Sequence, residues 1–225
     1  MIRLILFDID GTLIFTGGAG EKAFARVLDT QFGIQNGTAR VAFAGRTDPG
    51  IVREIFLNHG LEPTPENFAK FFDAYVFFLD HFLHQLRGGT HPGVWEWIQA
   101  LQRLSPPPVL GLLTGNISLG AEIKLRRFDL WDVFATGGFG DDHVERNRIA
   151  VVARKRGEQL LGAKLHDEEI LVVGDTPLDI TCGRHIGAKV LAVATGGAKL
   201  SQLQAHQPDW AVSDLRAVSV REACG

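Results

Sequence analysis

The chain has 225 residues, of which 45% are hydrophobic, and its formal net charge is −3. This length and apolar content suffice for the core of one medium-sized domain, or of one domain with a sizeable insertion. The near-balanced charge lacks the basic excess of a nucleic-acid-binding protein. The two cysteines, Cys182 and Cys224, are too few for a disulfide framework or a zinc site, and none of the eight histidines shows metal-ligand spacing.

Neither a secretory signal nor a membrane span is expected. The opening apolar run, residues 2–7, is too short for a signal peptide and is followed at once by acidic residues. The most apolar later stretch, residues 68–86, contains Lys70, Asp73 and Asp80, which would be costly inside a bilayer. The sequence therefore predicts a cytoplasmic protein with no membrane partner, and it leaves open whether that protein is a monomer or a homodimer.

The first predicted element is a buried strand over residues 2–7, which ends in Asp8 and Asp10. In an open α/β sheet, ligands bind just beyond the carboxyl ends of such strands. Two crowded carboxylates repel each other unless a cation or a reaction makes use of them, and Mg²⁺ suits their oxygen ligands. The alternative is a turn in which the aspartates only cap the strand.

Three helices are predicted next. A glycine-rich loop over residues 14–20 precedes a helix over residues 21–31. Asp48 is predicted to cap a second helix that has Pro49 at its first position. A third helix, after Thr64, carries a long aromatic stripe, which we interpret as helix packing rather than a cofactor pocket.

No strand pattern interrupts residues 16–89, so this segment is predicted to be an all-helical domain inserted after the first strand. A main domain would then consist of residues 1–15 and 90–225. Strands are predicted there at residues 109–113, 131–135, 170–173 and 189–194, with helices between them. This alternation predicts an α/β fold, with a parallel sheet of about five strands and helices on both faces.

Two later strands also end in small polar residues. Thr114, Gly115 and Asn116 follow one strand, and Asp175 and Asp179 follow another. Because the carboxyl ends of parallel strands share one edge, these residues should converge with the first aspartate pair. Carboxylates beside a hydroxyl and free backbone N–H groups can bind Mg²⁺ and phosphate together.

The motifs that carry this pattern are DIDGTL at residues 8–13, LLTGN at 112–116 and GDTPLD at 174–179. Together they resemble three of the four motifs of the haloacid dehalogenase superfamily. The helical insertion resembles the cap of its phosphoglycolate phosphatase and phosphoglucomutase branch. The resemblance covers the whole chain and implies a Rossmann-like core with a helical cap.

The resemblance also implies roles for the residues at the strand ends. Asp8 would be the nucleophile and Asp10 the general acid and base. Thr114 would hold the phosphoryl oxygens, with Gly115 and Asn116 completing the phosphate-binding loop.

Metal binding is implied in the same way. Mg²⁺ would be held by the Asp8 carboxylate, the Asp10 backbone carbonyl and Asp175. Asp179 would hydrogen-bond the basic residue of the site.

The fourth motif departs from the family pattern, in which a lysine is usual. Arg146 is our choice for the basic residue, with Arg148 as the alternative, and both could instead be surface arginines. The loop around Arg46 resembles the one through which related caps reach the substrate, so Arg46 is a candidate phosphate-binding or specificity residue. Cys182 is predicted to pack as a small residue against the sheet.

The resulting hypothesis is a Mg²⁺-dependent phosphatase that acts on a small phosphorylated metabolite, resembling phosphoglycolate, through an aspartyl-phosphate. A sugar-phosphate mutase of the β-phosphoglucomutase type is the alternative, because core and cap would be alike. A metal-free dehalogenase would leave Asp10 and Asp175 without roles. A phosphometabolite-binding module without activity is the non-enzyme alternative, and loss of a motif carboxylate would favour it.

Overall fold

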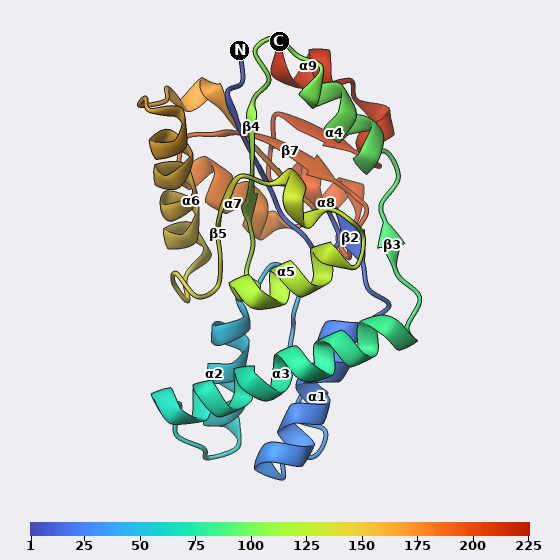
Figure 1. The fold of residues 1–225 in the computed structure, drawn as a ribbon, viewed down its shortest axis with the longest axis vertical. Coiled ribbons are helices and arrows are strands. Elements are labelled where there is room, and N and C mark those ends of the chain that lie inside the picture. Colours follow the sequence, from blue (N-terminus) through green and yellow to red (C-terminus); the bar gives the residue numbers. More distant parts are fainter.

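The computed structural model describes all residues, 1–225, and is organised around a parallel sheet of six strands in the order β5-β4-β1-β6-β7-β8 (Figure 1). The strands are β1 (Leu4–Phe7), β4 (Val109–Leu113), β5 (Thr136–Gly138), β6 (Ile170–Gly174), β7 (Lys189–Val193) and β8 (Trp210–Val212). The first strand of the chain therefore lies between β4 and β6, and Phe7 is in register with Leu112 on one side and Val173 on the other. The predicted α/β fold is confirmed.

Helices cover both faces of the sheet, which is why its strands are apolar on both sides. Ile5 and Phe7 point into one apolar cluster, and Leu4 and Leu6 point into another on the opposite face. The first face is covered by α4 (Val94–Gln102), α5 (Ser118–Arg126) and α9 (Val220–Cys224), and the second by α6 (Arg146–Leu161), α7 (Pro177–His185) and α8 (Leu200–Ala205). No helix combines the length and apolar content that a membrane span requires.

The remaining three helices lie together at one end of the molecule (Figure 1). They are α1 (Ala19–Phe32), α2 (Asp48–Asn58) and α3 (Pro65–Gln85), and they form most of a further apolar cluster, to which the loop after β4 contributes Ile117. The aromatic stripe of α3 is part of this core, since the ring of Phe24 lies 5.0 Å from that of Phe71 and 4.9 Å from that of Tyr75. The chain leaves and re-enters the main sheet through a short antiparallel pair, β2 (Ile14–Phe15) with β3 (Gly89–Thr90).

Two details of the sheet differ from the sequence prediction. The strand expected at residues 131–135 is wrong, because Trp131–Val133 is a 3-10 helix and β5 follows it. The aromatic side chains there pack against the first apolar cluster, whereas the true strand is short and rich in glycine. A Cβ on Gly138 would lie 2.6 Å from the backbone oxygen of Ile149, so the close packing of α6 on β5 requires glycine here. Glycine has a low propensity for strands, which is why the sequence did not indicate a strand at this position. The sixth strand, β8, was not expected.

The start of α2 also differs from the prediction. Thr47, not Asp48, is the N-cap, and its hydroxyl accepts a hydrogen bond from the backbone N–H of Gly50 at 3.2 Å. The carboxylate of Asp48 instead accepts a hydrogen bond from the backbone N–H of Ile117 at 2.9 Å. Asp48 thereby joins the helical segment to the loop after β4.

Candidate active site

Three neighbouring strands deliver the polar residues of the site. Because β1, β4 and β6 are parallel and in register, their carboxyl ends meet at one edge of the sheet. Asp8, Thr114 and Asp175 follow the ends of these strands, and all three are buried. The predicted convergence of the three motifs is therefore what the fold produces.

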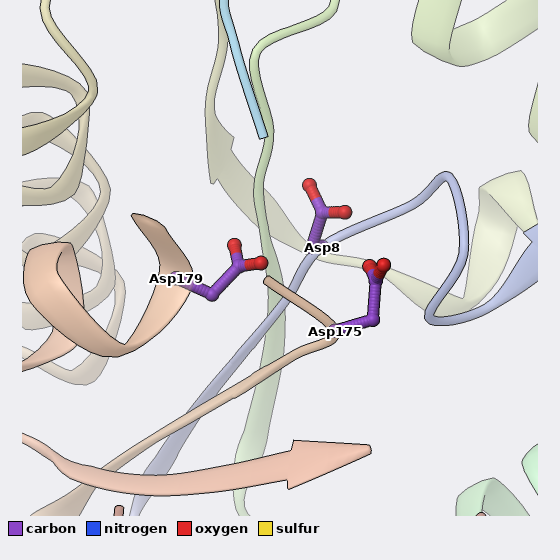
Figure 2. A group of neighbouring side chains, drawn as sticks. All are labelled: Asp8, Asp175 and Asp179. Atoms are coloured by element: carbon purple, nitrogen blue, oxygen red, sulfur yellow. The ribbon is translucent and has the colours of Figure 1, made fainter. Parts of the chain in front are cut away.

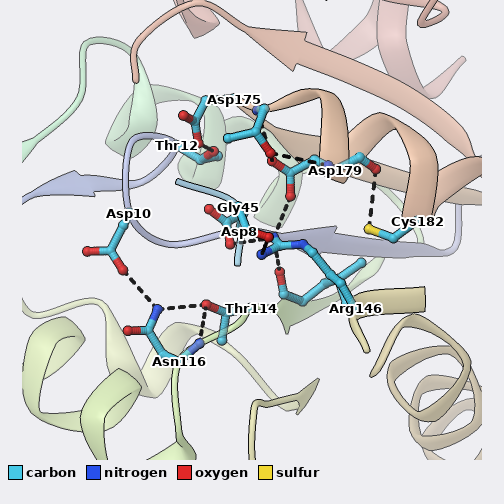
Figure 3. Close-up of polar contacts among 12 residues, drawn as sticks. Asp8, Asp10, Thr12, Gly45, Thr114, Asn116, Arg146, Asp175, Asp179 and Cys182 are labelled. Carbon is cyan, nitrogen blue, oxygen red and sulfur yellow. Dashed lines mark hydrogen bonds and ion pairs between the residues drawn. The ribbon is translucent and has the colours of Figure 1, made fainter. Parts of the chain in front are cut away.

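Arg146, the first residue of α6, lies against the carboxylate of Asp8. Its Nη2 donates to Asp8 Oδ1 at 2.7 Å, to the backbone oxygen of Leu113 at 3.2 Å, and to Asp179 Oδ1 (Figure 3). Its side chain is only 8% exposed. Arg148 is exposed, so of the two candidate arginines the fold brings only Arg146 to the site.

A compact group of carboxylates surrounds this arginine. One oxygen each of Asp8, Asp175 and Asp179 lies within 4.8 Å of the others (Figure 2). Asp179 is already engaged, since it accepts hydrogen bonds from both the backbone N–H and the hydroxyl of Thr176. Asp175 accepts a single side-chain hydrogen bond, from Thr12 at 2.9 Å. Asp8 and Asp175 are therefore the two carboxylates with oxygens left to bind a cation, and such hard oxygen donors fit Mg²⁺.

Glycines hold the Asp175 carboxylate closely. A Cβ on Gly11, whose φ is +88°, would lie 2.5 Å from Asp175 Oδ2, and one on Gly196 would lie 1.7 Å from it. Any larger residue would have to displace the carboxylate. The loops after β1 and β7 thus shape the position from which Asp175 can bind a metal ion.

Replacing Gly196 with alanine is accordingly expected to weaken the binding of a divalent cation such as Mg²⁺ about 10–100-fold, as loss of a ligand's support usually does. Titration calorimetry with MgCl₂ measures the affinity. Gly197→Ala is the matched control, because a Cβ there meets nothing within 4 Å. Equal affinities in the two variants would show that Asp175 is not held in this way.

Burial raises the pKa of three carboxyl groups around the site. For Asp8 the effect of burial exceeds the opposing effect of Arg146, and for Asp175 the neighbouring Asp179 raises the pKa further. Burial raises the pKa of Asp48 to about 7, although Lys124 and the N–H of Ile117 act in the opposite direction. Each group therefore binds its proton more tightly in the folded protein than in the unfolded chain.

The raised pKa of Asp48 makes the stability of the folded protein depend on pH. Between about pH 4 and 7 the folded protein retains a proton on Asp48 that the unfolded chain has lost, so the free energy of unfolding falls as the pH rises. In Asp48→Asn, which keeps an oxygen acceptor for Ile117, urea unfolding in EDTA should show a smaller decrease in that free energy between pH 5 and 8. Exposed Asp73→Asn is the control, and an unchanged decrease in Asp48→Asn would contradict the prediction.

The side chain of Asp10 points away from the carboxylate group toward α5 (Figure 3). Its Oδ2 accepts from Asn116 Nδ2 at 2.8 Å and from Lys124 Nζ at 2.7 Å. Asn116 also donates to the hydroxyl of Thr114 at 2.8 Å. Sequence reasoning missed Lys124, although its spacing places it on the buried face of α5 with Ala121.

The loop before α2 lies directly against the loop after β4. The backbone N–H of Asp48 donates to the backbone oxygen of Gly115 at 2.8 Å, and Arg146 Nη1 donates to the backbone oxygen of Gly45 at 3.2 Å. A Cβ on Gly115 would lie 2.0 Å from the backbone oxygen of Arg46, so this approach needs glycine. The guanidinium of Arg46 pairs with Glu54 at 2.6 Å.

A cavity of about 290 Å³ lies between these loops. Its lining includes Asp8, Asp10, Thr114, Asp175 and Arg146 as well as Gly115, Asn116, Arg46 and Lys124. Apart from Asp179 and Arg148, every candidate residue of the site therefore lines one cavity, and Asp179 is joined to it through Arg146. Cys182 lies outside it, buried in the apolar cluster beneath α7, as expected for a small packing residue.

The sheet and this cavity define an α/β enzyme whose acidic site lies at the carboxyl ends of the central strands. The family model of haloacid dehalogenase-like hydrolases matches residues 5–193. The chain therefore belongs to the haloacid dehalogenase-like hydrolase family, as the motifs indicated, and is a hydrolase.

Known proteins resemble the chain over nearly its full length. Pyrophosphatase PpaX of Bacillus cereus (strain AH820) is 28% identical over 218 residues, which cover 95% of this chain and 93% of that protein. A predicted phosphoglycolate phosphatase from Haemophilus somnus 129PT has a TM-score of 0.70 at 20% identity, with 95% of each chain covered. A putative β-phosphoglucomutase from Thermotoga maritima has a TM-score of 0.63 at 19% identity and covers 96% of this chain and 98% of its own. At these levels of identity, the two solved structures show that the fold is shared.

Proposed function

We propose that the protein is a Mg²⁺-dependent phosphatase that hydrolyses a small organic phosphate monoester through an aspartyl-phosphate. One observation carries this proposal. The Asp8 carboxylate lines the cavity with Arg146 at 2.7 Å from one of its oxygens, so the other oxygen can attack a phosphorus atom bound there. Family membership supports the same chemistry.

The reaction then has two steps. Asp8 forms a bond to phosphorus while the bond to the leaving oxygen breaks, and Asp10 gives its proton to that oxygen. In the second step Asp10 removes a proton from the water that hydrolyses the aspartyl-phosphate. Arg146, the Thr114 hydroxyl and the backbone N–H groups after it stabilise the charge on the phosphoryl oxygens.

Mg²⁺ would be held by the carboxylates of Asp8 and Asp175 and the backbone carbonyl of Asp10. When bound, it neutralises charge on the transferring phosphoryl group. Asp179 keeps Arg146 in place, since the two side chains are hydrogen-bonded.

We further propose that residues 16–89 form a cap domain over a catalytic core of residues 1–15 and 90–225. The apolar cluster formed mainly by α1 to α3 supports this division, and the loop contacts from Asp48 and Gly45 support a position of the cap over the site. In this arrangement Arg46, which lines the cavity, would contact the part of the substrate beyond its phosphate. Its present pairing with Glu54 would have to loosen for that contact.

The decisive experiment is phosphate release from a substrate panel. The panel contains p-nitrophenyl phosphate, 2-phosphoglycolate, and inorganic pyrophosphate because of the relatives named pyrophosphatase. We expect turnover with MgCl₂ and none with EDTA, while circular dichroism shows the protein still folded. EDTA-resistant turnover would contradict the metal role. No release from any substrate would favour the non-catalytic binding module.

The mutase remains a second candidate, because the fold shared with a putative β-phosphoglucomutase extends over helices and core alike. A mutase returns the phosphoryl group to a sugar rather than to water. Incubation with a hexose 1-phosphate separates the two activities, since a phosphatase releases phosphate and a mutase yields the isomeric hexose phosphate.

A further inference from the structure

Lys124 is a buried cation to which the proposed mechanism assigns no role. It lies in α5, and its side chain is only 6% exposed. Its ammonium group donates to Asp10 Oδ2 at 2.7 Å and to Asn116 Oδ1 at 2.6 Å. An ammonium group removed from water is costly unless it is paired and hydrogen-bonded, and these two contacts satisfy it.

The cap closes over this ammonium group. A Cβ on Gly20, at the start of α1, would lie 3.6 Å from Lys124 Nζ and 3.8 Å from the hydroxyl of Tyr75. The other lysines of the chain are not buried, whereas this one is turned into the cavity. Lys124 is therefore part of the cavity wall and not one of the solvent-exposed lysines of the protein surface.

The contacts of Lys124 fix the orientation of Asn116 as well as that of Asp10. An amide has one acceptor oxygen, so donation from Lys124 to Oδ1 makes Nδ2 face Asp10 and Thr114. The result is a closed triangle of Asp10, Asn116 and Lys124, joined through Asn116 to the hydroxyl of Thr114. The candidate acid and the candidate phosphate ligand are thus held by one network.

Both donors contact the same oxygen of Asp10. Asn116 and Lys124 each bind Oδ2, so Oδ1 is left without either of these contacts and can carry the proton that the leaving group receives. Asp10 is followed by Gly11 in the loop after β1, and its side chain is 42% exposed. Without the two donors it would sample several rotamers, and misplacement by about 1 Å can cost about 100-fold in rate.

We propose that Lys124 is the positioning residue that, with Asn116, holds the carboxyl group of Asp10 in the geometry for proton transfer to the leaving group. The proposal rests on the proposed phosphatase function. It assigns Lys124 no contact with the phosphoryl group, since its action passes through Asp10. Loss of Lys124 should therefore impair the proton-dependent part of the reaction more than substrate binding.

Two aryl phosphates of similar shape separate these effects. The kcat/KM value reports the steps up to aspartyl-phosphate formation, in which phenol leaves poorly without a proton and p-nitrophenol leaves well without one. In Lys124→Met, kcat/KM for phenyl phosphate should fall about tenfold further than for p-nitrophenyl phosphate. In Asp10→Asn the same selective loss is expected, and adding Lys124→Met to it should cause little further loss.

Lys164→Met is the matched control, because it breaks an ammonium–carboxylate pair that is remote from the cavity, between the exposed Lys164 and Glu158. Thermal unfolding of each variant monitors folding, and Lys124→Gln provides a second uncharged variant in case methionine prevents folding. Equal losses on the two substrates, or no loss, would overturn the positioning role while leaving the phosphatase function intact. Failure of the unmodified protein to hydrolyse either substrate would overturn the proposed function and the positioning role together.

Discussion

Asp8→Asn should abolish turnover of p-nitrophenyl phosphate, with a loss of about 10⁴-fold or more, because an amide cannot replace the attacking carboxylate. The substitution should not lower the midpoint of thermal unfolding. Burial already disfavours the charge of Asp8, and Arg146 keeps its second partner, Asp179. The loss is therefore expected to be chemical rather than structural.

Labelling distinguishes the nucleophile from the acid and base. With a ³²P-labelled aryl phosphate that has a good leaving group, rapid acid quenching should trap label on the unmodified protein and on Asp10→Asn, but not on Asp8→Asn. In Asp10→Asn the label should persist longer, because the base for its hydrolysis is missing. A fully active Asp8→Asn variant would refute the proposed mechanism.

Arg146→Met should reduce both activity and stability. Removing one partner of a buried ion pair leaves uncompensated charge, which typically costs about 3–5 kcal/mol, and Arg146 serves both Asp8 and Asp179. Loss of the hydrogen bonds that we propose from Arg146 to the phosphoryl oxygens should lower kcat by about 10²–10³-fold. Urea unfolding and kinetics with p-nitrophenyl phosphate measure the two effects.

Arg148→Met is the control for that variant, because Arg148 is exposed on the same helix only two residues further on. It should change the free energy of unfolding by no more than about 0.5 kcal/mol and leave activity intact. Arg146→Lys keeps the charge but loses the paired N–H donors of the guanidinium group. Its activity and its free energy of unfolding should therefore lie between those of Arg146→Met and Arg148→Met. An inactive Arg148→Met beside an active Arg146→Met would reverse the assignment of the basic residue.

Local sequence signals predicted the elements whose pattern is strong. The first strand and the helices of the insertion combine clear periodicity with glycine or proline boundaries, and their predicted positions agree with the structure to within a few residues. The strand prediction for residues 131–135 was wrong because aromatic residues favour strands in general. Here the aromatic side chains belong to a 3-10 helix and the residue after it, and they pack against the first apolar cluster. The true strand β5 is short and rich in glycine, for a reason that lies in its contact with α6.

Residues that act through distant partners were harder to predict. Asp48 matches the pattern of an N-cap, yet its carboxylate binds the backbone of Ile117, which is 69 positions away in the sequence. Lys124 resembles any lysine of an amphipathic helix until its partner, Asp10, is known. Helical spacing could have placed Lys124 on the buried face of α5, but not beside a particular carboxylate.

The sequence alone determined the α/β fold, the family and the three groups of polar residues at the strand ends, because strand ends and their motifs are local. It favoured Arg146 without excluding Arg148, because two residues that lie two positions apart in one helical turn differ only in the face of the helix to which they point. Tertiary structure made that choice by burying Arg146 between Asp8 and Asp179, where only a cation offsets the charge of two carboxylates. It also placed Lys124 beside Asp10, since packing of α5 against the sheet and the helical segment sets which of its faces is buried.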